Sequence, residues 1–303
     1  MFNEYLEVIG DEGNKILLSA YYSKNSKKSV LINHGMAEHQ QRYKDFINFL
    51  NSNSINVFIY DHRGHGNRIT TSDPLGVFGK ENGWSLVVND LINVSNFLIK
   101  KYSDHTFSIL GHSMGSYITL DSIQSGNPIK NYILSGSSVP SGSILLFQQL
   151  FLKFSNLMKG RSNYSNTMHK LVFGGFNKSI KHPRTQSDWL SYSTNSVDEY
   201  VADPLCGFVV SNSLWGDLLY GFKRIFDKNR LHLYHPNLDV LILSGREDAA
   251  GSFGLGPKKL YQMLSSQISI CNLKLYDAMR HEILNEPSKN IVYHDVLDYL
   301  NNK

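Results

Sequence analysis

The sequence predicts an α/β protein, built on a mostly parallel β-sheet with helices on both faces. Short β-rich runs alternate with runs whose apolar residues recur every three or four positions, and several β-rich runs end in glycine-bearing loops. Parallel neighbouring strands need long crossover connections, which helices supply. With 303 residues, 41% of them hydrophobic, the chain is long enough for one substantial core.

The elements of the first half follow one another in this alternating order. Two β-rich runs flank the turn residues 10–14, which predicts a hairpin over 4–23. The elements predicted after it are a strand at 29–35, a helix at 42–53, a strand at 55–66, a helix at 84–102, a strand at 106–111 and a helix at 114–126.

The second half contains a long interruption. A strand is predicted at 129–138, and then the alternation stops for about a hundred residues, far longer than an ordinary connection. It resumes with a strand at 240–244, a helix at 257–267, a strand at 272–282 and a helix at 287–300, where Pro287 suits the first turn. We therefore expect a core formed by residues 1–138 and 236–303 and an inserted segment at residues 139–235.

The bulk properties exclude several classes of protein. Thirty Lys and Arg against 26 Asp and Glu leave a net charge of +4 without a basic stripe, so nucleic acid is not an expected partner. Cys206 and Cys271 form neither a disulfide framework nor a metal-binding pattern. The start of the chain lacks the pattern of a signal peptide, and no apolar run approaches the roughly 18 residues of a membrane span. We expect a cytoplasmic protein, with peripheral attachment to membranes left open.

The stretch Gly111-His112-Ser113-Met114-Gly115 stands between a predicted strand and a predicted helix. In this context Gly-x-Ser-x-Gly is the pattern of a nucleophile elbow, a tight turn that holds a serine above the sheet. The amino end of the following helix favours negative charge that develops beside the serine. We therefore expect Ser113 to be a nucleophile.

A serine needs a base, and the base needs a carboxylate that orients it. In this fold the acid and then the histidine follow the nucleophile along the chain, each just after a strand. Asp248 and His281 occupy these positions. Glu247 and Asp277 are rival acids, but we expect them to point elsewhere, and we expect His112 to pack behind the turn.

Two main-chain N–H groups are expected to bind the oxyanion that forms during acyl transfer. One belongs to Met114, directly after the nucleophile, and the other to Met36, in the loop His34-Gly35-Met36. The histidines of this loop and of the segment Asp61-His62-Arg63-Gly64-His65-Gly66 lack the spacing of a known hydrolytic metal motif. We therefore predict no metal and no cofactor. Glu38 and Arg42 are expected to pair with each other across one helical turn.

Six segments together resemble the α/β-hydrolase superfamily, and within it the monoacylglycerol lipase and lysophospholipase group. They are HGMAEHQQRY, YDHRGHG, LGHSMGS, YVADPLCGF, SGREDAAG and RHEILNE, between residues 34 and 286. The resemblance implies an eight-stranded sheet, a helical lid inserted after strand six, and hydrolysis of esters that carry one acyl chain. It places the nucleophile on Ser113, the acid on Asp248, the base on His281, and the oxyanion donors on Met36 and Met114.

Several alternatives remain open at this point. The same scaffold serves thioesterases, acyltransferases and peptidases, and a non-catalytic ligand-binding protein could retain it. Residues 143–158 are rich in Leu and Phe. They are interpreted either as a helix that packs on the core, or as an apolar face that lines an acyl tunnel and touches membranes or micelles. The expected small-molecule partner is a lipid ester, and the sequence does not indicate an oligomeric state.

Overall fold

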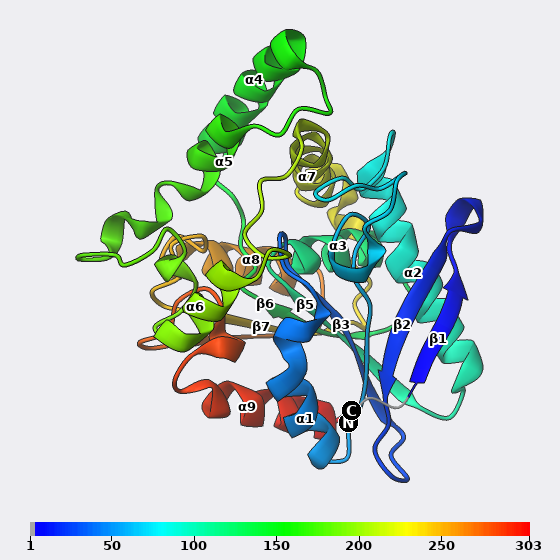
Figure 1. Cartoon of the computed structure of the whole chain (residues 1–303). Coiled ribbons are helices and arrows are strands. Elements are labelled where there is room, and N and C mark those ends of the chain that lie inside the picture. Colours follow the sequence, from blue (N-terminus) through cyan, green and yellow to red (C-terminus); the bar gives the residue numbers. More distant parts are fainter. Residues whose placement is uncertain (1–3) are drawn as a thin grey trace.

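The computed structural model describes residues 4–303 and contains an eight-stranded sheet in the order β1-β2-β4-β3-β5-β6-β7-β8 (Figure 1). The strands are β1 (Glu4–Ile9), β2 (Lys15–Tyr21), β3 (Lys28–Asn33), β4 (Asn56–Ile59), β5 (Thr106–His112), β6 (Asn131–Ser135), β7 (Asp239–Gly245) and β8 (Ile270–Tyr276). β1 and β2 form the predicted hairpin, and β2 pairs antiparallel with β4. All the other pairings are parallel, so the mostly parallel sheet expected from the sequence is confirmed.

Helices cover both faces of the sheet. The helices outside the inserted segment are α1 (Lys44–Ser52), α2 (Gly83–Lys101), α3 (Met114–Gln124), α8 (Leu255–Ser265) and α9 (Lys289–Asn301). α1 and α9 lie on one face, whereas α2, α3 and α8 lie on the other (Figure 1). The last helix begins at Lys289, so Pro287 lies before it and not in its first turn.

The alternation of side chains along the central strands explains the two layers of the core. In β3, Val30 and Ile32 pack toward α1 and α9, whereas Leu31 packs toward α2 and α3. All three side chains are fully buried, as expected for a parallel strand covered on both faces. This rigid sheet carries the loops at its carboxyl ends, where the site lies.

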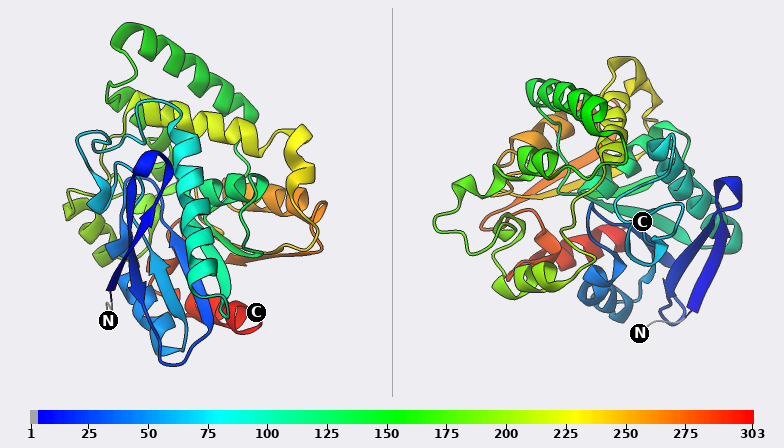
Figure 2. Two further views of the ribbon diagram at one scale, coloured as in Figure 1. Left: turned by 90° about the vertical axis from the view of Figure 1, so that its right-hand side faces the viewer. Right: turned by 45° about the horizontal axis from the view of Figure 1, so that its top comes forward.

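The chain between β6 and β7 forms four α-helices: α4 (Gly142–Lys159), α5 (Asn166–Phe173), α6 (Thr194–Ala202) and α7 (Asn212–Ile225). α7 packs against α2 and α3, and the buried carboxylate of Asp121 in α3 holds α7 in place. Asp121 accepts hydrogen bonds from Trp84, Arg224 and Arg230. α4 packs on α7 and α5 but extends away from the rest of the molecule (Figures 1 and 2). Within residues 4–303, no helix combines the length and the apolar composition that crossing a bilayer requires.

Candidate active site

Ser113 occupies the turn between β5 and α3 with a backbone φ of 50° and ψ of −121°. This is a strained conformation for a residue other than glycine. The two glycines of the motif make the turn sterically feasible. A Cβ on Gly111 would lie 2.7 Å from Cα of Ser116, and a Cβ on Gly115 would lie 2.1 Å from the carbonyl oxygen of Asn33. The turn therefore holds Ser113 at the carboxyl end of the central strands.

Three side chains predicted from distant parts of the sequence form one hydrogen-bonded chain. Nε2 of His281 lies 2.9 Å from Oγ of Ser113, although the two residues are 168 positions apart. Nδ1 of His281 lies 3.0 Å from Oδ2 of Asp248. Asp248 is 0% exposed and His281 is 3% exposed. These contacts have the geometry that a serine, its base and an orienting carboxylate require.

Close packing of two loops brings Asp248 and His281 together. β7 ends at Gly245, and a Cβ there would lie 2.2 Å from the carbonyl oxygens of Met279 and Arg280. The loop that carries His281 can therefore cross directly over the end of β7. The other carboxylate oxygen of Asp248 accepts a hydrogen bond from the backbone N–H of Ala250 at 2.9 Å, which fixes the carboxylate.

The electrostatic setting makes His281 a stronger base than ordinary histidine. Burial alone would lower the pKa of His281, but the negative charge of Asp248, with smaller effects of Glu282 and Glu38, outweighs it and raises the pKa. His112, whose ring centroid lies 5.1 Å from that of His281, behaves in the opposite way. Burial, and then the proximity of His281, hold the pKa of His112 well below its usual value. His112 is therefore neutral and packs beside His281.

The two expected oxyanion donors lie beside Ser113. Met114 is the first residue of α3, and Met36 lines the same cavity as Ser113. The loop of Met36 approaches Ser113 closely, because a Cβ on Gly35 would lie 3.3 Å from Cβ of Ser113. Within residues 4–303, neither the N–H of Met36 nor that of Met114 donates a hydrogen bond. Both are available to a ligand.

Histidines support the oxyanion loop from behind. His34 and His62 lie with ring centroids 4.3 Å apart, and the Nε2 atom of His62 lies 3.0 Å from the carbonyl oxygen of His34. His65 lies 5.6 Å from His34, ring to ring. Burial lowers the pKa of His34 to about 4 and that of His65 to about 3, so these rings stay neutral. The segment of residues 61–66 thus packs beside this loop.

The expected pairing of Glu38 with Arg42 is wrong. Arg42 forms its ion pair with Glu282, the residue after His281. Glu38 instead accepts hydrogen bonds from the N–H of Gly35 and from the hydroxyl of Tyr43. Burial, and then the charge of Glu282, raise the pKa of Glu38 to about 7. The reason is tertiary: the His281 loop brings Glu282 within reach of Arg42, and Glu38 turns back toward its own loop.

The rival acids lie away from the imidazole. Glu247 is exposed and accepts a hydrogen bond from the hydroxyl of Tyr192. Asp277 is exposed and pairs with Arg246. Neither carboxylate contacts His281. Of the three candidate acids, Asp248 is the one that bonds to the histidine.

A cavity of about 770 Å³ contains Ser113 and His281 in its wall, together with the oxyanion loop. This volume is typical of a site for a small molecule. Much of the remaining wall comes from the inserted segment, namely from the end of α5, the loop after it, and Tyr200 and Gly207. No residue of α4 lines this cavity.

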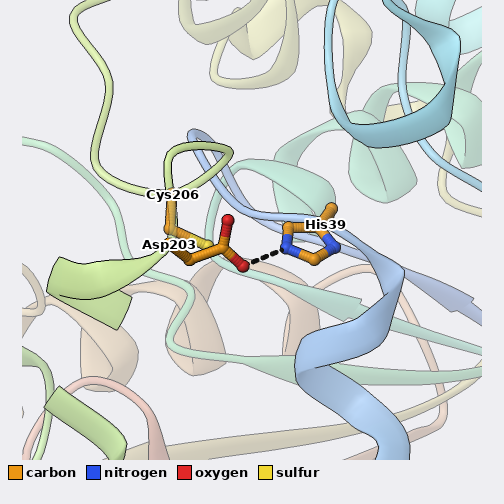
Figure 3. Close-up of side chains that lie close together, drawn as sticks. All are labelled: His39, Asp203 and Cys206. Carbon is orange, nitrogen blue, oxygen red and sulfur yellow. Dashed lines mark hydrogen bonds and ion pairs between the residues drawn. The ribbon is translucent and has the colours of Figure 1, made fainter. Parts of the chain in front are cut away.

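One cluster with potential metal ligands lies next to the oxyanion loop. The ligand atoms of His39, Asp203 and Cys206 lie within 4.8 Å of one another (Figure 3). Hydrogen bonds already use both oxygens of Asp203: one lies 2.8 Å from Nε2 of His39, and the other accepts from the N–H of Leu205. Burial raises the pKa of the Cys206 thiol, which opposes the thiolate that a metal would need. We infer that these three residues have a structural role and hold residues 203–206 against His39.

Residues 203–208 also lie beside the oxyanion loop. The N–H of Gly207 donates to the carbonyl oxygen of Ala37 at 2.9 Å, so the inserted segment contacts the oxyanion loop through its main chain.

Trp189 is a site residue that no sequence pattern predicted. It lines the cavity, and its ring centroid lies 5.1 Å from that of His281. Trp189 stands in a short 3-10 turn of the inserted segment, without a motif or an apolar period around it. Its proximity to His281 depends on tertiary packing, and no local signal could have revealed it.

Several known proteins are similar to this chain. The monoglyceride lipase of Rattus norvegicus is 26% identical in an alignment of 297 residues, which covers 93% of this chain and 84% of the lipase. The monoacylglycerol lipase of Mycolicibacterium smegmatis is 24% identical over 276 residues, which cover 89% of this chain and 87% of that lipase.

Two solved structures share the fold. The carboxyl esterase of Bacillus coagulans in complex with glycerol superposes with a TM-score of 0.89 at 21% identity, covering 99% of this chain and 98% of the esterase. A soluble variant of the monoglyceride lipase of Saccharomyces cerevisiae, in complex with a substrate analog, gives a TM-score of 0.72 at 20% identity, covering 100% of this chain and 94% of the lipase. The fold is therefore that of the α/β-hydrolases.

The family model described as "Hydrolase_4: Serine aminopeptidase, S33" matches residues 24–288, which include the elbow, both loops that meet at the imidazole and the whole inserted segment. The chain belongs to this hydrolase family.

Proposed function

We propose that this chain is a serine hydrolase that cleaves carboxylic esters of lipids with a single acyl chain, through a covalent acyl-enzyme. The observation that carries the proposal is the hydrogen-bonded chain from Ser113 through His281 to Asp248. The similarity to monoglyceride lipases over about nine-tenths of the chain supports the choice of substrate class.

In the proposed acylation step, Nε2 of His281 removes the proton from Oγ of Ser113 as that oxygen attacks the ester carbonyl. Asp248 orients the imidazole and stabilises its charged form. The N–H groups of Met36 and Met114 donate to the oxyanion of the tetrahedral intermediate. His281 then protonates the departing alcohol, and water, activated by the same histidine, releases the fatty acid from Ser113.

The inserted segment (residues 139–235) acts, in this proposal, as a lid that supplies much of the cavity wall. The outward face of α4 gives it a second role, contact with lipid aggregates. The exposed apolar side chains on this face of α4 are Ile144, Leu146, Phe147, Leu150, Phe154, Leu157 and Met158. α4 contains two lysines and no acidic residue, so an anionic lipid surface does not repel it. A contiguous apolar face of this kind favours insertion at the membrane interface.

Covalent labelling tests the nucleophile. A fluorophosphonate probe should label the wild-type protein and the Ser266→Ala control, whose exposed serine lies at the end of α8, but not Ser113→Ala. Labelling of Ser113→Ala at the wild-type rate would overturn the assignment.

A substrate panel tests the class. A monoacylglycerol, a lysophospholipid, an acyl thioester and an aminoacyl amide should be compared at matched concentrations, with and without micelles. Turnover of the two single-chain esters should exceed that of the amide by at least tenfold. Faster cleavage of the amide would replace the proposed esterase by a peptidase on the same residues.

A further inference from the structure

Trp189 contacts the imidazole that the proposed mechanism uses as its base. The two ring centroids are 5.1 Å apart and the ring planes are inclined by 41°. Phe173 stacks on Trp189 at 5.7 Å and 18°, and Phe176 meets it edge to face at 4.9 Å. The indole is therefore held between two aromatic rings of the inserted segment and the imidazole.

Two hydrogen bonds hold the segment around Trp189 against the loop that carries His281. The carbonyl oxygen of Asp188 accepts a hydrogen bond from the Arg280 side chain at 2.7 Å. The carbonyl oxygen of Leu190 accepts one from the N–H of Glu282, also at 2.7 Å. The residues on either side of Trp189 thus bond to the residues on either side of His281. Trp189 lies in the inserted segment, but these two hydrogen bonds hold it in a fixed position relative to the loop of His281.

The face of an indole ring carries negative electrostatic potential and attracts a cation within about 6 Å of its centroid. The imidazole of His281 becomes a cation when it takes the proton of Ser113. An apolar neighbour such as leucine would fill the same space without this attraction. The contact therefore gains strength in the step where charge develops, which is the requirement for a contribution to rate.

We propose that Trp189 is a positioning residue for His281: its indole holds the imidazole in line with Ser113 and stabilises the imidazolium that forms during acylation. This inference rests on the proposed role of His281 as the base. The other ionisable groups that face the imidazole are Asp248 after β7, Glu282 on the same loop, Glu38 on the oxyanion loop, and His112 at the end of β5. They remain unchanged when Trp189 alone is substituted.

The test measures the pKa of His281 directly, by ¹⁵N NMR titration of the imidazole in the free protein, with the signal assigned from His281→Gln. Trp189→Leu keeps the site apolar but removes the aromatic face, and Trp189→Phe keeps a weaker one. The control is Phe176→Leu, which removes a ring that contacts Trp189 and belongs to the same cluster.

We expect the pKa of His281 to fall by about 0.5–1 unit in Trp189→Leu and by less in Trp189→Phe. In Phe176→Leu it should stay within 0.2 unit of wild type, on the order of the error of such a titration. On a short-chain soluble ester, Trp189→Leu should lose about tenfold in kcat with little change in KM, and the acid limb of the profile of kcat/KM should move to lower pH.

A pKa that stays constant or rises in Trp189→Leu, with a loss confined to KM, would reduce Trp189 to a wall of the cavity and overturn the proposal. If substitution prevents folding, tetrafluorotryptophan introduced at position 189 keeps the shape and weakens the ring potential, and the pKa should still fall. The NMR measurement needs no turnover. If Ser113 is not labelled by fluorophosphonate while the pKa falls as expected, the proposed function fails and the contact between Trp189 and His281 stands.

Discussion

The main chain of Gly115 lies directly against the main chain of Asn33. A Cβ on Gly115 would be 2.1 Å from the Asn33 carbonyl oxygen and 2.4 Å from that of His34. The contact joins the start of α3 to the end of β3, from which the oxyanion loop departs. The glycine of the motif therefore sets the distance between Ser113 and the loop of Met36.

Gly115→Ala should consequently damage both stability and activity. The added methyl group cannot avoid backbone atoms, and overpacking of this kind typically costs about 1–3 kcal/mol. We expect a lower urea midpoint and loss of ester hydrolysis. The control is Gly142→Ala, because a Cβ on Gly142 meets nothing within 4 Å. Equal midpoints for the two variants would contradict the close approach.

Asp248→Asn should lower kcat for a short-chain ester by about 10⁴, because asparagine favours the wrong tautomer of the imidazole. That loss equals about 5.4 kcal/mol of barrier. Glu247→Gln is a matched control, since it removes the neighbouring carboxylate, which contacts Tyr192 and not His281. Its kcat should stay within about twofold of wild type. A larger loss of kcat in Glu247→Gln than in Asp248→Asn would show that Glu247, and not Asp248, is the acid that orients His281.

The pH dependence of kcat/KM should reflect the raised pKa of His281. The base must be neutral, so activity should fall as the pH drops through a value above the ordinary 6.5 of histidine. The same shift affects stability with the opposite dependence. The folded protein binds this proton more tightly than the unfolded chain, so the stabilisation is present below about pH 6.5 and is lost as the pH rises through the folded pKa. Stopped assays from pH 5 to 9 would measure kcat/KM. A midpoint of the acid limb at or below pH 6.5 would contradict the raised pKa of His281.

The double change Phe154→Glu and Leu157→Glu should weaken attachment to lipid vesicles. Burial of each such side chain contributes about 1.5–3 kcal/mol, so the partition coefficient should fall tenfold or more. Hydrolysis of a soluble ester should not change, because α4 lines no part of the cavity. Ile291→Glu, on an exposed position of α9, is the control. Flotation with phosphatidylcholine vesicles measures the effect, and equal binding by both variants would exclude α4 as the contact.

Asp121→Ala should loosen the inserted segment from the core. The carboxylate is buried and bonds to Trp84, Arg224 and Arg230, and the two arginines are 28% and 24% exposed. Since water can partly rehydrate these arginines, we expect a loss of about 2–3 kcal/mol of unfolding free energy, below the full cost of isolating a buried charge. Asp198→Ala breaks the exposed pair with Arg184 and should leave the urea midpoint unchanged. A similar midpoint in both variants would show that Asp121 contributes little.

The alternation of strands and helices, the parallel sheet, and the positions of Ser113, Asp248 and His281 along the chain could all be predicted from the amino-acid sequence. These features depend on local chemistry. Apolar periodicity selects strand or helix, and the elbow requires a glycine on each side of the serine. Because the carboxyl ends of parallel strands lie at one edge of the sheet, the strand order then brings such loops together.

The side chains that surround the imidazole could not be predicted from the sequence. Trp189 reaches His281, and Arg42 pairs with Glu282 and not with Glu38, because loops far apart in the sequence pack against each other. The direction in which α4 extends (Figure 1) also could not be predicted from its residues, since the same apolar helix can face a core or a lipid surface. Such contacts depend on how whole segments pack, and the spacing of residues along one segment carries no information about its partner.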